Sequence, residues 1–316
     1  MRILIIGGTK FIGPYVVRSL HKKGHEVILF NRGKSHYPFL IPVTTIKGDR
    51  AELSSFSNEL LSLSPDVIID MIPYSELDTK QLADIFHRSI KRIVIVSSCD
   101  VYRAYDRLWK VFTDQIIPMP LNEKSELRQN LYPYRKLLDT KRNDWKYDYE
   151  KILVEKTIRS YSDINSTILR LPIVYGPGDH RVNPYLKLMD DNQPILIDEH
   201  KANWRFTRGY VEDIAHAIVL SALDERSGKF IYNVGEIKAY SELEWINQIA
   251  KIACYYNEII KVPFDELPSA LQEPLLDFDQ DLILDTNLIR KELKYEELST
   301  HEQAMRNTVE WSQRHK

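Results

Sequence analysis

Short runs of Val, Ile and Leu alternate with segments of helical periodicity through the first half of the chain. The apolar runs are RILII, EVILF, DVIID and RIVIV, and TTIKG is a further short strand candidate. Helical patterns lie between them, at about 11–23, 53–63 and 77–87. Near-continuous apolar runs are typical of strands that helices cover on both faces, so the order predicts an α/β fold with a doubly wound parallel sheet.

The regular alternation stops after the fourth run, which indicates how the rest of the chain is organised. Residues 103–146 are charged, aromatic and proline-containing, and a connection of this length is usually a functional cover or a mobile segment. We therefore expect a flap there, inserted in a first domain of residues 1–172. Residues 173–316 should form mainly a smaller α+β substrate lobe, with segments of about 205–235 returning to the first domain.

Composition excludes several classes of protein. The 316 residues are 43% hydrophobic and 28% charged, with a formal net charge of -2, so total charge signals no nucleic-acid or anionic membrane partner. The two cysteines are far apart and the histidines show no ligand spacing, so no metal site is predicted. The start of the chain has no signal-peptide pattern and no apolar run approaches about 20 residues, so we expect a cytoplasmic protein without a membrane partner.

A glycine-rich turn follows the first predicted strand. Glycines at this place let the backbone approach a pyrophosphate closely, and the next helix directs its N-terminus at the phosphates. The usual fingerprint has another glycine where this chain has Lys10, whose side chain either reaches a phosphate or lies in solvent. The expected cofactor-binding residues of the turn are Gly7, Gly8, Thr9, Lys10, Phe11, Ile12 and Gly13.

The end of the second predicted strand favours NADP over NAD. Sites that prefer NAD carry an acidic residue here for the ribose, whereas this chain has Asn31 and Arg32. A guanidinium offers a planar fork of donors to a 2′-phosphate, although an Arg on a solvated turn would look the same in sequence. Asp49 is a further candidate for cofactor binding, and NAD remains the alternative cofactor.

Two Tyr-x-x-x-Lys pairs stand close together in the middle of the chain. Tyr147 and Lys151 are predicted one turn apart on a helix, where both side chains would share a face. Tyr132 and Lys136 have the same spacing but straddle Pro133, which disturbs the helical register. We therefore favour the first pair as the acid–base couple and assign the second to the flap surface.

These motifs together resemble the short-chain dehydrogenase/reductase superfamily, and more closely its extended or atypical NAD-dependent epimerase/dehydratase branch. The resemblance runs over nearly the whole chain through GGTKFIG, SSCDVY, YDYEKILVEK, RLPIVYGPGD, RGYVEDIAHAI, YNVG and DTNLIRKEL. It implies a Rossmann-type first domain and a catalytic set of Ser98, Tyr147 and Lys151, with Glu155 one turn after the lysine. A cation beside a phenol favours its ionised form, so the tyrosine can take a proton from a substrate alcohol as hydride leaves for the nicotinamide.

The resemblance also implies candidates for the cofactor wall and the substrate. Pro172 would border the nicotinamide, and an Asn that sugar-nucleotide enzymes commonly carry is Ile173 here, which argues against a diphosphosugar. Dehydration would need a further acid–base pair, for which Asp100 is the candidate, but the usual glutamate partner is Val101. The expected substrate residues are Asp100, Tyr175, His180, Arg205 and Arg208.

Two functions follow from these observations. The first is an NAD(P)-dependent oxidoreductase or epimerase acting on a sugar, nucleotide sugar or related polyol or ketone, with dehydration less favoured. The alternative is a cofactor-bound RNA-binding or regulatory protein, because atypical relatives with a similar GGTRFIG turn are described as RNA-binding. Near-neutral charge and the complete Ser98, Tyr147 and Lys151 set disfavour RNA as the partner. Extended relatives often pair through the catalytic helix, so a homodimer is also an expectation.

Overall fold

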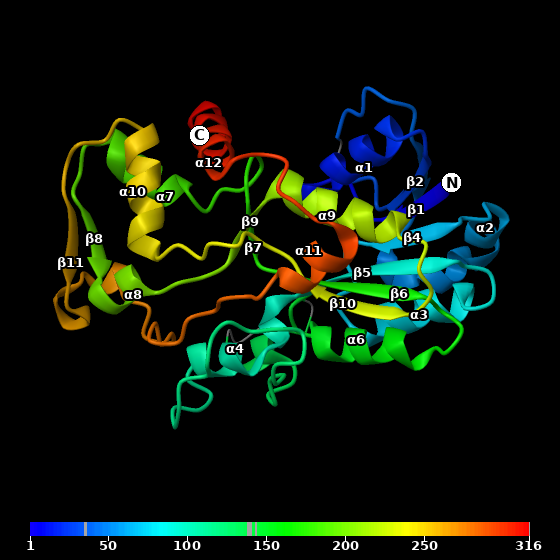
Figure 1. Cartoon of the computed structure of the whole chain (residues 1–316), viewed down its shortest axis with the longest axis horizontal. Coiled ribbons are helices and arrows are strands. Elements are labelled where there is room, and N and C mark those ends of the chain that lie inside the picture. Colours follow the sequence, from blue (N-terminus) through cyan, green and yellow to red (C-terminus); the bar gives the residue numbers. More distant parts are fainter. Residues whose placement is uncertain (35–36, 138–140, 143, 316) are drawn as a thin grey trace.

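The centre of the molecule is a parallel sheet of seven strands (Figure 1). The structure is a computed structural model, and it describes residues 1–34, 37–137, 141–142 and 144–315. The strand order is β10-β6-β5-β4-β1-β2-β3. The bounds are β1 (Arg2–Ile6), β2 (Glu26–Asn31), β3 (Thr44–Lys47), β4 (Val67–Asp70), β5 (Arg92–Ser98), β6 (Ser166–Leu171) and β10 (Lys229–Asn233). The expectation of a doubly wound α/β fold is confirmed.

Helices cover both faces of this sheet because each strand presents apolar side chains to both. In β1, Ile3 and Ile5 belong to one buried cluster, and Leu4 and Ile6 belong to the other. The first cluster includes residues of α1 (Ile12–Lys22) and α9 (Val211–Leu223). The second includes residues of α2 (Ser57–Ser62), α3 (Glu76–Phe86) and α6 (Lys151–Ser160). The predicted helices at about 11–23 and 77–87 correspond to α1 and α3.

The carboxyl ends of the strands carry short helical turns before the covering helices. The turns are η1 (Arg50–Phe56) after β3 and η2 (Cys99–Val101) after β5. Helix α3 begins with a capping box, in which the Ser75 and Asp78 side chains each accept a backbone N–H of the other residue. These local caps fix where each helix leaves the sheet.

A smaller lobe lies beside the main sheet, at the left of Figure 1. It has a parallel strand pair, β8 (Ile195–Asp198) with β11 (Ile259–Val262). Its helices and turns are α7 (Asn183–Asp190), α8 (Glu199–Asn203), α10 (Glu242–Ile252), η3 (Phe264–Glu266), η4 (Ser269–Leu271) and α12 (His301–Arg314). A second pair, β7 (Ile173–Tyr175) with β9 (Arg208–Tyr210), lies between the lobe and the sheet, and α11 (Asn287–Leu293) packs near β10.

The segment expected to be a flap contains α4 (Arg103–Leu108) and α5 (Pro133–Leu137). Isolated β-bridges join Tyr102 to Leu127 and Leu121 to Leu284, so the segment is tied to itself and to the C-terminal part of the chain. Residues 138–140 and 143 of the expected flap lie outside the described residues.

The helix expected to carry Tyr147 and Lys151 on one face is the main difference from the sequence prediction. Helix α6 begins at Lys151, and its N-cap is Glu150, whose side chain accepts the N–H of Ile152. The expected helical relation between Tyr147 and Lys151 is therefore wrong. The carboxylate cap, which the Tyr-x-x-x-Lys spacing does not reveal, sets the start of the helix four residues later than predicted.

Candidate active site

The candidate site lies where the carboxyl ends of β1, β4 and β5 meet. The chain crosses from one half of the sheet to the other between β1 and β4, and ligands of open α/β sheets bind in the crevice at such a reversal. The glycine-rich turn follows β1, and Ser98 ends β5. The first residue of α6, Lys151, completes this edge of the sheet.

The glycine-rich turn has a backbone that other residues could not follow. Gly7 and Gly8 have φ of 95° and 88°. A Cβ on Gly13 would lie 2.4 Å from backbone atoms of Gly8, so the helix can approach the turn because this side chain is absent. Lys10 is exposed, whereas the neighbouring Phe11 and Ile12 are half-buried. The close approach of backbone to backbone gives the turn a shape that fits a dinucleotide phosphate, and the N–H groups of Gly7 and Gly13 donate to the carbonyls of Phe30 and Lys10.

At the end of β2 the residues expected for nucleotide selection have different roles. The Asn31 side chain accepts the N–H of Gly33 at 2.8 Å and shapes the turn. Arg32 is exposed. Asp49 is also exposed and caps η1 by accepting the N–H of Ala51 at 3.0 Å. Arg32 and Lys34 are therefore exposed cations of this turn.

Lys151 is a buried cation at the edge of the site. Lys151 is 4% exposed, and its ammonium donates to the carbonyl of Pro73 at 2.8 Å and to that of Val96 at 2.9 Å. Burial lowers the pKa of Lys151 to about 8, while Asp100 and Asp70 act in the opposite direction. The ammonium is thus held by main-chain oxygens of β4 and β5 ends, with its charge balanced by nearby carboxylates.

Two phenol rings lie beside this lysine, those of Tyr74 and Tyr149, whereas Tyr147 lies elsewhere. The Lys151 ammonium is 5.3 Å from the centre of the Tyr74 ring. The Lys151 ammonium is 5.5 Å from the centre of the Tyr149 ring, and the Tyr149 hydroxyl donates to Asp100 at 2.8 Å. Ser98 is also among the groups that interact with the Tyr149 phenol. Tyr147 is half-buried with its ring under the Arg135 guanidinium, 4.4 Å from ring centre to carbon. The structure therefore brings Ser98 and Lys151 together with Tyr149.

Of the competing Tyr-x-x-x-Lys pair, the structure describes the tyrosine side chain and the backbone of the lysine. Tyr132 has a φ of 54°, and its ring lies 3.7 Å from the Arg135 guanidinium carbon. Lys136 belongs to α5, and its side chain lies outside the described part of the structure.

Aromatic side chains line the outer side of the site. The Tyr74 and Trp145 rings are 4.6 Å apart, and the Trp145 ring is 5.8 Å from that of Tyr149. Tyr134 lies 5.2 Å from the Tyr149 ring and hydrogen-bonds Tyr105 at 3.1 Å. Trp145 is 54% exposed, so this cluster runs from the buried Tyr149 to the solvent.

A buried ion pair attaches the flap to the first turn of α6. Arg128 donates to both carboxylate oxygens of Glu150 at 2.9 Å, and neither side chain is exposed. Its Nε also donates to the carbonyl of Asp100 at 2.7 Å. Glu150 accepts the N–H of Tyr132 as well, at 2.6 Å. This arrangement fixes Asp100 and the start of α6 relative to one another.

Pro172, expected at the cofactor wall, and Tyr175, expected to contact substrate, are buried in the junction with β7 and β9. A Cβ added to Gly209 or Gly235 would come within 3.4 or 3.3 Å of the Pro172 ring. Tyr175 is 1% exposed and donates to Glu236 at 2.5 Å. Both residues therefore pack inside the protein between the sheet and the second lobe.

The basic residues expected to contact substrate are held by other partners. Arg208 is buried, pairs with Glu242 and lies 4.4 Å above the Trp245 ring. Arg205 is exposed and donates to the carbonyl of Ala239 at 3.1 Å. The guanidinium of Arg208 is therefore engaged inside the second lobe.

His180, the remaining substrate candidate, is exposed, and its ring lies 5.4 Å from that of Trp311 in the C-terminal helix.

Sequence reasoning missed Tyr149, Tyr134 and the Arg128–Glu150 pair. Tyr149 stands two residues before Lys151, a spacing that places side chains on one face of an extended segment and not of a helix. Glu150 is an uncommon N-cap residue, so no signal in the sequence predicted the late helix start. Long-range contacts of Arg128 and Tyr134 had no local signature.

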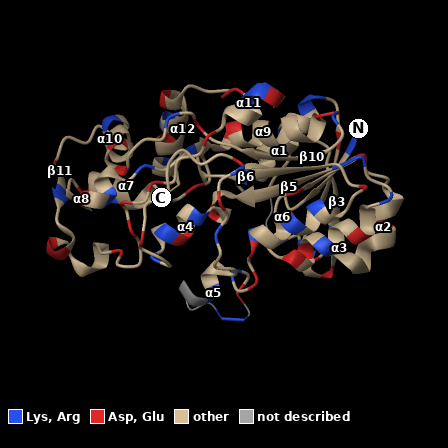
Figure 2. Cartoon of the chain, turned by 60° about the horizontal axis from the view of Figure 1, so that its bottom comes forward, with Lys and Arg blue, Asp and Glu red and all other residues tan. Residues whose placement is uncertain are grey.

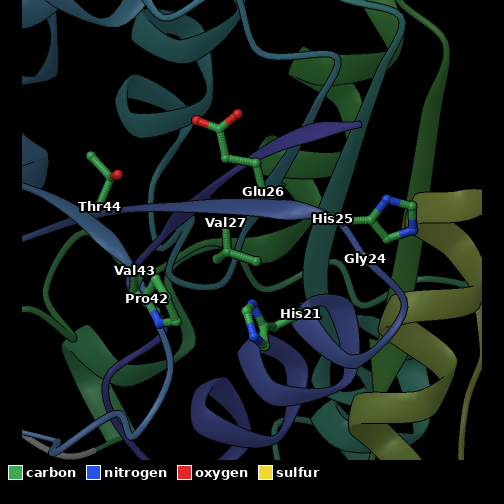
Figure 3. Close-up of a pocket in the computed structure, with 8 residues that line it drawn as sticks. All are labelled: His21, Gly24, His25, Glu26, Val27, Pro42, Val43 and Thr44. Atoms are coloured by element: carbon green, nitrogen blue, oxygen red, sulfur yellow. The ribbon is translucent and has the colours of Figure 1, made fainter.

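A surface hollow lies away from this site (Figure 3). It has a volume of about 550 Å³ and is lined by His21, Gly24, His25, Glu26, Val27, Pro42, Val43 and Thr44. Glu26 and Thr44 begin β2 and β3, so the hollow is at the amino ends of the strands. In parallel sheets ligands bind at the opposite, carboxyl ends, and we assign this hollow no role in the chemistry.

Two kinds of feature are absent from the described residues. No group of three or more His, Cys, Asp or Glu side chains there is placed to hold a metal ion. Within the same residues, none of the helices combines the length and apolar character that crossing a membrane requires.

Comparison with known proteins defines the class. The chain matches the model of the NAD dependent epimerase/dehydratase family over residues 3–235, and it belongs to this family. The resemblance seen in the sequence is confirmed, and so is the expectation of an enzyme of the epimerase/dehydratase type.

Two relatives and one solved structure show the range of similar proteins. The chloroplast stem-loop binding protein of 41 kDa b of Arabidopsis thaliana is 25% identical, and the match covers 74% of this chain and 58% of the plant protein. The UDP-N-acetyl-alpha-D-glucosaminuronate decarboxylase of Bacillus cytotoxicus is 23% identical over 98% of this chain and 97% of the relative. The crystal structure of UDP-glucose 4-epimerase from Thermotoga maritima with UDP-glucose has a TM-score of 0.75 at 17% identity, covering 100% and 99% of the two chains.

Proposed function

We propose that this protein is an NAD(P)-dependent oxidoreductase or epimerase that acts on an alcohol or ketone of a sugar, nucleotide sugar or related polyol. The proposal rests on the buried Lys151 ammonium, which lies beside a phenol that also interacts with Ser98. These groups lie at the carboxyl ends of the strands, the edge of the sheet at which the glycine-rich turn also lies. A cofactor in that turn would supply hydride transfer. The chain would supply the proton chemistry and the binding of the reacting oxygen.

Each residue has a distinct part in this proposal. Two protons of the Lys151 ammonium go to main-chain carbonyls, which leaves the third for a ribose hydroxyl of the cofactor. Ser98 would hydrogen-bond the substrate oxygen. The tyrosine takes or returns the alcohol proton, and the role expected for Tyr147 stays a prediction that the comparison of Tyr147 and Tyr149 variants tests.

A nucleotide sugar is the substrate class that the relatives favour. The name of the Bacillus cytotoxicus relative specifies a UDP-linked sugar acid, and the match to it spans nearly the whole of both chains. Ile173, at the place where sugar-nucleotide enzymes commonly carry Asn, argues in the other direction. We therefore include UDP-glucose and UDP-glucuronic acid as probes, together with simple polyols.

The test is binding and turnover by the purified full chain. Fluorescence titration should detect NADH or NADPH binding, and one of the probes should be epimerised or should change the redox state of the cofactor. Lys151→Met should reduce turnover by about 100-fold or more, whereas Lys156→Met, an exposed lysine on the same helix, should not. Absence of dinucleotide binding by the wild-type chain would refute the proposal.

We further propose that Arg32 selects NADP. Its guanidinium is exposed at the end of β2, where the neighbouring Asn31 side chain is engaged in the turn. Arg32→Met should weaken NADPH binding by about 10-fold and leave NADH binding within about 2-fold, which corresponds to the loss of one charge-assisted contact. Lys34→Met, another exposed cation of this turn, is the matched control. Equal NADH and NADPH affinities in the wild type would refute the selection of NADP.

RNA binding is the second function, and the stem-loop binding relative is the observation that favours it. Basic and acidic residues are interspersed along the ribbon in Figure 2, which disfavours a wide anionic partner. An electrophoretic shift of a stem-loop RNA that weakens steeply with salt would support this function.

A further inference from the structure

The carboxyl group of Asp100 is buried at the centre of the tyrosine cluster. The residue is 4% exposed. Its Oδ2 accepts the hydroxyl of Tyr149 at 2.8 Å and that of Tyr134 at 3.3 Å. Its Oδ1 is also buried and has no hydrogen-bond partner in the described part of the chain. A buried carboxylate oxygen without a donor is costly, so this group is poised to gain a proton or a ligand donor.

The backbone around Asp100 is fixed from two directions. Its N–H donates to the Ser98 hydroxyl oxygen at 3.2 Å, and its carbonyl accepts from Arg128 at 2.7 Å. Arg128 in turn holds Glu150, the residue between Tyr149 and Lys151. The distance between the phenol and the carboxylate is therefore set by a rigid, buried framework and not by a mobile surface contact.

The surroundings of Asp100 and Tyr149 favour the protonated form of each group. Burial raises the pKa of Asp100, an effect that Arg128, Tyr149 and Lys151 oppose and Glu150 reinforces. Burial also raises the pKa of the Tyr149 phenol well above its ordinary value, and the adjacent Asp100 carboxylate adds to this. Tyr105 and Tyr134 face the same carboxylate as neutral phenols. A phenol that donates to a carboxylate is not already ionised, so it can accept a proton if it passes its own to the carboxylate.

We propose that Tyr149, backed by Asp100, is the acid–base pair of the reaction, an inference that rests on the proposed function. In oxidation, the substrate alcohol would give its proton to the Tyr149 oxygen, and an oxidised nicotinamide cofactor held by the glycine-rich turn would accept the hydride from the same carbon. The Tyr149 hydroxyl proton moves at the same time to Oδ2 of Asp100. The products are the ketone, the reduced cofactor and a protonated Asp100, and reduction runs the same transfers in reverse. In this proposal Tyr149 contacts the substrate. Asp100 positions the Tyr149 hydroxyl and holds the proton that this hydroxyl releases.

Three variants of the full chain separate this pair from Tyr147. Tyr149→Phe and Asp100→Asn should each lower turnover of the active probe, UDP-glucose or UDP-glucuronic acid, by about 100-fold or more. Tyr147→Phe should remain within about 3-fold of the wild type. NADH or NADPH affinity should change less than about 3-fold in all three variants, which establishes that they fold and bind cofactor. Loss of turnover in Tyr147→Phe with retention in Tyr149→Phe would overturn the assignment.

A second measurement tests the contact without needing a substrate. In protein labelled with ¹³C at the tyrosine ζ carbons, the signal that is missing from Tyr149→Phe identifies Tyr149 among the 18 tyrosines and should titrate above the ordinary phenol pKa. Asp100→Asn should lower the titration midpoint of that signal by at least about one pH unit, because a carboxylate no longer opposes ionisation. An unchanged midpoint would overturn the Asp100 contact. Because this titration is read without dinucleotide, a failure of cofactor binding counts against the proposed function and leaves the test of the pair intact.

Discussion

Replacement of Arg128 by Met should loosen the attachment of the flap to the active site. The side chain makes hydrogen bonds to both oxygens of Glu150 and to the carbonyls of Asp100 and Asn130, and it is fully buried. Met has a similar length and no charge. The substitution therefore removes the interactions with little change in the occupied volume.

The expected loss of stability follows from what the substitution leaves behind. Removing one partner of a buried ion pair costs about 3–5 kcal/mol, because the remaining charge has no counterion. Glu150 keeps the N–H groups of Tyr132 and Ile152 as donors, at 2.6 and 2.8 Å. These contacts offset part of the loss, so we place Arg128→Met at the lower end, about 3 kcal/mol.

Amide hydrogen exchange is the appropriate assay, because a chain of 316 residues need not unfold in one step. The N–H groups of Tyr132 and Ile152 both donate to Glu150 and report on this attachment. A loss of about 3 kcal/mol corresponds to exchange about 100-fold faster at these amides. Arg135→Met is the matched control, since Arg135 pairs with Asp148 and both side chains are partly exposed, at 34% and 67%. It should cost less than about 1 kcal/mol.

The double variant Arg128→Met/Glu150→Gln distinguishes the buried charge from general loss of packing. Gln can still accept the capping N–H but leaves no unpaired charge, so the double variant should recover about 2 kcal/mol relative to Arg128→Met. The reasoning fails if Arg128→Met exchanges like the control. It also fails if the double variant is as unstable as the single one.

Further predictions concern the buried lysine and the glycine-rich turn. The folded pKa of Lys151, about 8, lies below the ordinary 10.5, so the unfolded state binds more protons between these values and stability rises with pH there. Lys151→Met should remove this rise in the free energy of unfolding, which is on the order of 3 kcal/mol between pH 8 and 10.5. Urea denaturation curves recorded over this pH range would show the loss, with Lys156→Met as the control. An equal pH dependence in both variants would contradict the buried charge. Gly13→Ala should destabilise the turn by about 1–3 kcal/mol, because the added methyl group would meet the backbone of Gly8. The same substitution should weaken NADH binding at least about 10-fold. Unchanged NADH affinity in a fluorescence titration would refute the close approach.

The parallel sheet and the glycine-rich turn could be predicted because their signals are local. In the run Arg2–Ile6, the four residues after the arginine are apolar and buried, on both faces of the strand. Such a run is typical of a strand of a parallel sheet that helices cover on both faces. Gly7, Gly8 and Gly13 mark a backbone path that residues with a Cβ cannot follow. Ser98, the last residue of β5, was selected from the family resemblance instead.

The tyrosine at the site illustrates what local pattern could not supply. Spacing of four predicts a shared face only on a helix, and α6 begins at Lys151 because the Glu150 side chain caps it. Glu150 is held there by Arg128, a residue 22 positions earlier in the flap.

From the sequence alone came the layered fold and the place of the glycine-rich turn, since hydrophobic period and backbone sterics act over a few neighbouring residues. The serine and lysine candidates came from the family resemblance. The tertiary structure decided which phenol rings lie near the lysine and which arginines are bound to protein carboxylates. Those outcomes depend on the free energy of desolvation. A buried charge such as that of Arg128 needs a partner of opposite charge, and Glu150, its partner, comes from a distant part of the chain.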